Sequence, residues 1–172
     1  QAEHGVDSQA MLVTASESIV EPVMQAIREQ LDRLPRKEIT EKSLSHSRLI
    51  VLKDKQEVID FTNLYAPEHL IIQTADYADI AGQIENAGSV FMGPYTPESA
   101  GDYASGTNHT LPTNGYAKDY SGVNLDSFIK KITFQEITAD GIRLLGGTIR
   151  TMAANEQLDA HKNAVTIRLK TL

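Results

Sequence analysis

Arg48-Leu-Ile-Val-Leu-Lys53 is the stretch of this 172-residue chain that decides the fold class. Its four central residues are all apolar, as in a strand that is buried on both faces of a parallel sheet. A helical pattern begins at Asp54 and is stopped by Pro67, and a second strand pattern, Glu68-His-Leu-Ile-Ile-Gln73, follows. A strand, a helix and another strand in succession predict a parallel pair joined by a right-handed crossover.

The same alternation continues outward in both directions. Before this unit, a strand is predicted at residues 10–14, then a helix with one apolar face that ends at Pro35, then a short polar helix at 37–45. After it, a helix at 76–85 precedes a fourth strand at 89–92. This order of elements predicts an α/β fold with a parallel, doubly wound sheet, an incomplete Rossmann-like arrangement.

The end of the chain predicts a helical tail. Residues 131–138 alternate and predict an edge strand, whereas 139–154 and 156–169 repeat apolar residues at helical spacing. This segment has few residues with which to close its own core, so we expect it to pack on another surface, such as a partner subunit. The predicted domains are therefore an α/β portion, residues 1–123, and a C-terminal helical tail, residues 124–172.

The fourth strand leads into a long segment, residues 93–115, without helical or strand periodicity. It holds three of the six prolines and four of the eleven glycines, together with Asp102, Asn108 and His109. Ligands of open parallel sheets bind beyond the carboxyl ends of the strands, where this segment begins. Because long loops in compact domains are usually functional or disordered, we interpret it as an ordered site loop. A mobile surface loop with incidental polar groups is the alternative.

Composition excludes several classes of partner and site. The net charge of −7 argues against a nucleic-acid backbone or an anionic membrane as partner. No apolar run approaches the roughly 20 residues of a membrane span. The absence of cysteine excludes disulfides and thiolate metal sites, so a metal would need His, carboxylate or amide ligands. No Gly-x-Gly-x-x-Gly fingerprint for a dinucleotide follows any predicted strand.

Two pairs of neighbouring residues are candidates for chemistry. Gln1 and His4 have a spacing that permits two metal ligands, although two solvated residues near the chain start are the simpler interpretation. Glu68 and His69 join a carboxylate to an imidazole, the groups that general acid-base catalysis uses. Each pattern is weak when taken alone.

Three further residues have equally plain alternatives. Asp102 follows a glycine and fits a turn aspartate. His161 follows Glu156 by five residues, as in an exposed pair on a helix. His46 lies in a polar stretch and is expected on the surface.

Five motifs together resemble the histidinol dehydrogenase family, and they occur in the family's order along the whole chain. These motifs are Gln1-Ala-Glu-His-Gly5, Ala66-Pro-Glu-His-Leu70, Gly93-Pro-Tyr-Thr-Pro-Glu-Ser-Ala-Gly-Asp-Tyr103, Ser105-Gly-Thr-Asn-His-Thr-Leu-Pro-Thr113 and Leu158-Asp-Ala-His-Lys-Asn-Ala-Val165. Chains of that family are much longer, so the sequence resembles their C-terminal portion alone.

The resemblance implies a cytoplasmic enzyme of histidine biosynthesis that requires zinc and oxidises L-histidinol to L-histidine through the aldehyde, with two NAD. It places the zinc ligands at Gln1, His4, Asp102 and His161. These donors are nitrogen and oxygen atoms, which suit zinc without cysteine.

The same resemblance places the acid-base pair at Glu68 and His69. Substrate contacts would come from Glu156, from His69 and from the four zinc ligands, with His109 near the substrate.

The resemblance also implies a homodimer in which the tail of one subunit completes the site of the other. The NAD contacts and a substrate-binding serine are expected outside this chain, so the chain alone is expected to be inactive. Two alternatives remain: a non-catalytic dimerisation and metal-binding module, and a zinc hydrolase that uses Glu68. The order of the motifs disfavours the hydrolase.

Overall fold

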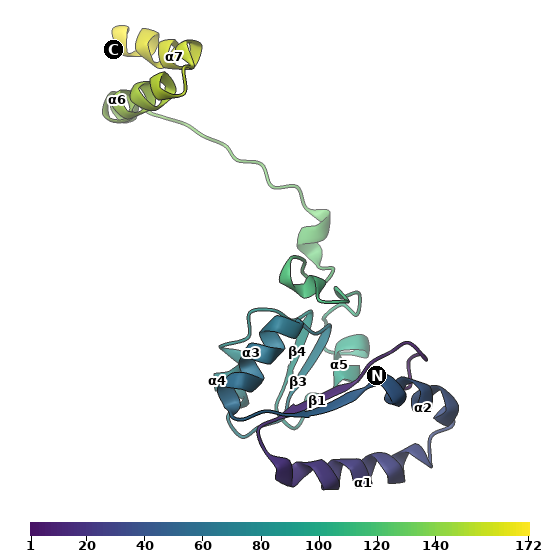
Figure 1. Ribbon diagram of the computed structural model, residues 1–172. Helices are drawn as coiled ribbons and strands as arrows, with labels where there is room; N and C mark the ends of the chain where they lie inside the picture. Colours follow the sequence, from purple (N-terminus) through teal and green to yellow (C-terminus); the bar gives the residue numbers. More distant parts are fainter. The chain divides into compact units, whose positions relative to one another are not determined.

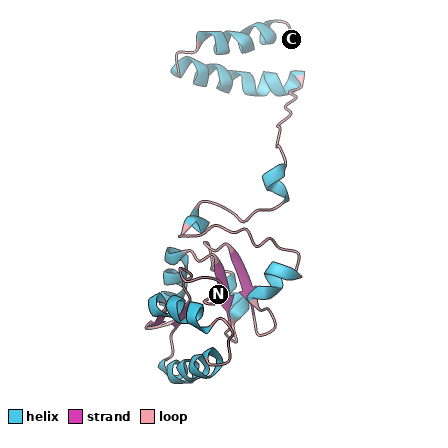
Figure 2. Cartoon of the chain, turned by 90° about the vertical axis from the view of Figure 1, so that its right-hand side faces the viewer, coloured by secondary structure: helices cyan, strands magenta, loops and turns pink.

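The computed structural model describes all 172 residues. They form two compact units, residues 1–128 and residues 129–172 (Figures 1 and 2). The first unit contains all the strands, and the second contains two long helices. None of the helices is both long and apolar enough to cross a membrane.

Four short strands form two parallel pairs in the first unit. β1 (Met11–Thr14) pairs with β2 (Arg48–Val51), and β3 (His69–Ile72) pairs with β4 (Ser89–Met92). The α/β class and the parallel pairing are confirmed, but the strands form two separate two-stranded sheets where we expected one sheet. Each strand has only four residues and one hydrogen-bonded neighbour.

Helices connect these strands at positions close to those predicted from apolar spacing, and three further short helices, α5, η2 and η3, follow the last strand. Their bounds are η1 (Glu17–Ile19), α1 (Val20–Leu31), α2 (Lys37–His46), α3 (Lys55–Tyr65), α4 (Tyr77–Ala81), α5 (Glu98–Tyr103), η2 (Tyr116–Lys118) and η3 (Leu125–Phe128). α5 lies inside the segment that showed no helical periodicity, because six residues are too few to display one.

The core of this unit lies between the β3–β4 pair and helices α3 and α4. Ile59, Ile72 and Ile80 are buried together, and part-buried apolar residues surround them, among them Leu70 and Val90. Successive side chains of a strand point to opposite faces. The neighbours of Leu70 and Val90 in sequence, His69 and Phe91, therefore point to the other face of the pair, where α5 lies (Figure 1).

The two ends of α3 fix where β3 begins. Asp54 caps the first turn by accepting a hydrogen bond from the backbone N–H of Glu57 (3.0 Å). The last turn ends at Ala66, which is buried and adopts a left-handed conformation with φ of 54°. Pro67 follows and cannot continue the helix. The chain therefore turns sharply and delivers His69 to the first position of β3.

A salt bridge joins the beginnings of α3 and α4. The Lys55 ammonium lies 2.7 Å from Oδ2 of Asp76. This hydrogen bond lowers the pKa of the Asp76 carboxyl and raises the pKa of Lys55. Both groups face solvent, so salt would screen their attraction.

The second unit is a helical hairpin of α6 (Ala139–Asn155) and α7 (Asp159–Lys170), drawn side by side in Figure 2. Gly146 allows the helices to approach closely, because a Cβ there would lie 2.8 Å from Cδ1 of Leu169. Ala153 and Val165 are buried in the same contact. The helical tail is confirmed.

Two local predictions are wrong. Residues 131–138 form no strand, because an alternating sequence needs a neighbouring strand to pair with and the chain supplies none there.

His46 is part-buried, and its Nε2 lies 2.7 Å from the backbone oxygen of Ser8. This histidine therefore helps to hold the start of the chain against α2.

Candidate active site

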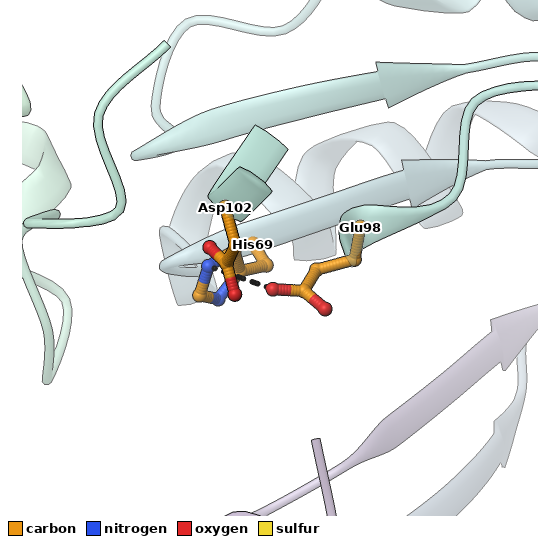
Figure 3. Close-up of side chains that lie close together, drawn as sticks. All are labelled: His69, Glu98 and Asp102. Atoms are coloured by element: carbon orange, nitrogen blue, oxygen red, sulfur yellow. Dashed lines mark ion pairs between the residues drawn. The ribbon is translucent and has the colours of Figure 1, made fainter. Parts of the chain in front are cut away.

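Three side chains from β3 and α5 gather on the face of the β3–β4 pair that lies opposite the core. They are His69, Glu98 and Asp102 (Figure 3), and their ligand atoms all lie within 4.8 Å of one another. Glu98 and Asp102 are four residues apart on α5, so they share one face of the helix. The cluster depends on how β4 and α5 are held together.

Phe91 of β4 supports both halves of the cluster. Its ring stacks on His69, with ring centroids 6.0 Å apart and planes inclined by 27°. α5 lies directly against the same ring, because a Cβ at Gly101 would be only 2.7 Å from Cε1 of Phe91. Thr107 also donates a hydrogen bond from Oγ1 to the backbone oxygen of Gly101 (3.2 Å). A residue without a side chain is thus required at position 101.

The Nε2 edge of His69 faces Glu98. Nε2 lies 3.5 Å from Oε1 of Glu98, and the two side chains are only 11% and 17% exposed. Oε1 of Glu98 is buried and accepts no hydrogen bond. The carboxylate therefore has the imidazole as its nearest ionic partner.

The Nδ1 edge of His69 faces a different pair of groups. Nε2 of the Gln1 side chain lies 3.3 Å from Nδ1, and Oε1 of Glu68 lies 4.0 Å from it. The beginning of the chain is therefore brought to a residue 68 positions later. A short turn holds this beginning, with the N–H of His4 donating to the backbone oxygen of Gln1 (3.1 Å).

The geometry brings some of the residues singled out from the sequence together. His69 and Asp102 share the cluster, and Gln1 and Glu68 lie beside His69. His4 is exposed and is not one of the three clustered side chains.

The remaining residues singled out from the sequence lie elsewhere. His109 is exposed in the segment after α5. Glu156 caps the end of α6 and His161 lies in the first turn of α7. These two belong to the second unit, so their part in a site stays a prediction.

Glu98 was missed by the sequence analysis. It lies inside a motif quoted for the family resemblance, but no role was inferred for it. Its position four residues before Asp102 is the signal that could have found it, since that spacing aligns two carboxylates once the segment is helical.

The clustered donors fit a divalent cation such as zinc. An imidazole, two carboxylates and the nearby Gln1 amide supply nitrogen and oxygen donors within a small, part-buried volume. Zinc and similar ions bind such donors in proteins.

Comparison with known proteins decides the family. Residues 1–169 match the family model for histidinol dehydrogenase. This chain belongs to the histidinol dehydrogenase family. Over 172 residues it is 66% identical to a histidinol dehydrogenase from Bacteroides fragilis (strain YCH46), and over 173 residues it is 57% identical to the chloroplastic histidinol dehydrogenase of Arabidopsis thaliana.

A solved histidinol dehydrogenase has the same fold. The crystal structure of histidinol dehydrogenase from Elizabethkingia anophelis matches 99% of this chain with a TM-score of 0.92 and 55% sequence identity. The chain covers 39% of that protein, 40% of the Bacteroides relative and 37% of the Arabidopsis relative. It thus spans about two fifths of the length of these relatives, and its resemblance to a portion of the family's chains is confirmed.

Proposed function

We propose that this chain supplies the acid-base and metal-binding part of a zinc-dependent, NAD-linked histidinol dehydrogenase of histidine biosynthesis. The supporting observation is the cluster of His69, Glu98 and Asp102 in a chain that matches the family over its length. The proposed reaction oxidises L-histidinol to L-histidine through the aldehyde, with transfer of two hydrides to two NAD.

Zinc would be held by Gln1, His4, Asp102 and His161. Of the donors gathered at the cluster, only Asp102 and Gln1 would bind the ion, whereas His69 and Glu98 would lie beside it. When bound, it would orient the imidazole and amine of the substrate and fix the alcohol carbon for hydride departure. The closeness of Gln1 to His69, and of His69 to Asp102, supports this assignment. Glu156 and His109 are proposed as further substrate contacts.

Proton transfer is assigned to His69. In the first oxidation, the hydroxyl proton of histidinol moves to His69 while the hydride leaves for NAD, so that a C=O bond replaces the O–H and C–H bonds. In the second oxidation, His69 takes the hydroxyl proton of the aldehyde hydrate in the same way. A neutral imidazole suits both steps because one of its ring nitrogens has a lone pair that can accept the proton.

Hydration of the aldehyde is assigned to Glu68. Its carboxylate accepts a proton from the water that adds to the aldehyde carbon, next to the imidazole that acts in the two oxidations. Oε1 of Glu68 and Nδ1 of His69 are 4.0 Å apart. This short distance supports the proposal that both bases act at the same carbon of the substrate.

NAD contacts are proposed for the part of the family's chain that these 172 residues do not cover. A homodimer is proposed as well, with Glu156 and His161 supplied across the subunits. Exposed apolar side chains on the helical hairpin support a protein partner there, since Leu144 is 82% exposed and Met152 is 59% exposed. A cytoplasmic location is proposed, although the Arabidopsis relative is described as chloroplastic.

Turnover of histidinol tests the proposal. The full-length protein that carries this sequence is expected to produce two NADH for each L-histidinol consumed, to lose activity when a chelator removes zinc and to regain it when zinc is added. The 172-residue chain alone is the control and is expected to be inactive. Failure of the full-length, zinc-loaded protein to reduce NAD with histidinol would contradict the assignment.

The narrower alternative is a module that dimerises and binds metal without a reaction. The exposed hairpin surface is the observation that favours it. Under this alternative the full-length protein binds zinc and forms dimers but does not reduce NAD.

A further inference from the structure

We propose that Glu98 is a positioning residue for His69, which its carboxylate holds as the tautomer with the proton on Nε2. The other ring nitrogen, Nδ1, is then the atom that accepts the substrate proton. This inference rests on the proposed function for the identity of the reaction, but the tautomer itself is a property of the protein alone.

The first argument comes from the donors and acceptors around Nε2. An ionised carboxylate only accepts hydrogen bonds, so a ring nitrogen that faces it at 3.5 Å is favoured as N–H. A lone pair at Nε2 would instead face the negative oxygen and be repelled. Oε1 of Glu98 is buried and accepts no hydrogen bond, so the imidazole 3.5 Å away is the nearest group that could donate one to it.

The second argument comes from the opposite edge of the ring. The Gln1 amide nitrogen, 3.3 Å from Nδ1, is a donor and not an acceptor, so Nδ1 is favoured as the nitrogen with the lone pair. The Glu68 carboxylate oxygen also lies on this edge, but its 4.0 Å distance from Nδ1 is longer than the 3.5 Å between Glu98 and Nε2 and the 3.3 Å between Gln1 and Nδ1. The nearest contact on each edge therefore favours the same tautomer. The lone pair points to the side where Gln1 and Glu68 lie, the residues proposed to bind zinc and to activate the water.

The third argument is the rigidity of the arrangement. His69 stacks on Phe91, and the helix that carries Glu98 lies against that same ring at Gly101. The carboxylate and the imidazole thus share one buried support, which fixes their separation. With the two side chains only 17% and 11% exposed, their attraction is less screened than it would be at a surface.

The tautomer can be measured directly. In full-length protein with ¹⁵N-labelled histidine and no zinc, the ring nitrogen shifts of His69, assigned with a His69→Gln variant, are expected to show hydrogen on Nε2. Glu98→Gln replaces an obligatory acceptor by an amide that can also donate, so a mixture of tautomers is expected. A parent protein with the proton on Nδ1 would overturn the inference even if the variant failed to fold.

Kinetics give the second readout. Glu98→Gln is expected to lower kcat by about 10- to 100-fold, the usual effect of losing a residue that orients a reacting group, with KM for histidinol and bound zinc unchanged. Glu85→Gln, the same change at an exposed position of the connection between α4 and β4, is the matched control and is expected to keep parental values.

Two outcomes would refute positioning. Loss of zinc from the Glu98→Gln protein would make Glu98 a metal ligand instead. A parental tautomer together with a parental kcat in that variant would mean that the carboxylate does not act on the ring. If the parent itself fails to oxidise histidinol, the proposed function is wrong, but the ring nitrogen shifts still test the positioning.

Discussion

Gly101 determines whether the two carboxylates of α5 can lie beside His69. The helix backbone approaches Phe91 so closely that even a methyl group at position 101 would overlap the ring. Phe91 is 5% exposed and its ring stacks on His69, so the ring cannot move away easily. Relief must come from a shift of α5, which carries Glu98 and Asp102.

Gly101→Ala is therefore expected to cost about 1–3 kcal/mol of folding free energy, the usual cost of overpacking. It is also expected to lower kcat in the full-length protein by more than the loss of stability explains. Urea unfolding and steady-state kinetics measure the two effects. Gly82→Ala is the matched control, because a Cβ there meets its nearest atom at an ordinary 3.6 Å. Equal behaviour of the two variants would contradict the role given to Gly101.

The sequence predicted single residues of the site unevenly. His69 and Asp102 could be singled out because an imidazole and an aspartate stood in family motifs. Glu98 could not, because its contact with His69 exists only when β3, β4 and α5 come together. Contacts between segments that are far apart in the sequence produce no repeating pattern of residues from which they could be predicted.

At the scale of elements, α3 is the helix that places His69. Its N-cap and its left-handed C-terminal residue fix both ends, and the catalytic pair assigned to Glu68 and His69 follows within three residues of Ala66. Asp54→Ala removes the cap and is expected to cost about 1 kcal/mol of folding free energy.

Urea unfolding of the Asp54 variants measures that cost. Asp54→Asn is the control, because its side-chain oxygen still accepts from the N–H of Glu57 and should keep most of the stability. If the Asn variant lost as much as the Ala variant, the negative charge, which lies 3.7 Å from the Lys53 ammonium, would be the stabilising feature instead of the cap.

Elements were predicted well where the signal is local. The spacing of apolar residues indicated α1, α3 and α6, and continuous apolar runs indicated β2 and β4. The pairing of strands was predicted less well, because it depends on residues far apart in the chain. The alternating residues 131–138 illustrate this limit, since their pattern alone cannot supply a neighbouring strand.

At the scale of the whole molecule, the helical hairpin presents more apolar surface than a small unit usually leaves in water. Leu144, Met152 and Ile167 are all more than half exposed, whereas Ala153 and Val165 are buried between the helices. A second copy of the chain is the partner proposed for this surface. In such a dimer, Glu156 and His161 of one chain would complete a site whose other residues belong to the first unit of the partner chain.

Mixing two inactive variants tests this shared site in the full-length protein. If the second unit of one chain completes the site of the other, a dimer of one Asp102→Ala chain and one His161→Ala chain contains one doubly altered site and one unaltered site. Random exchange of subunits in a symmetric dimer should then restore about a quarter of parental activity per site. Mixing Asp102→Ala with His69→Ala is the control and should restore nothing, because both changes lie in the first unit. If each site is instead built within one chain, the Asp102→Ala and His161→Ala mixture should also recover no activity, because every chain would then carry a substitution in its own site.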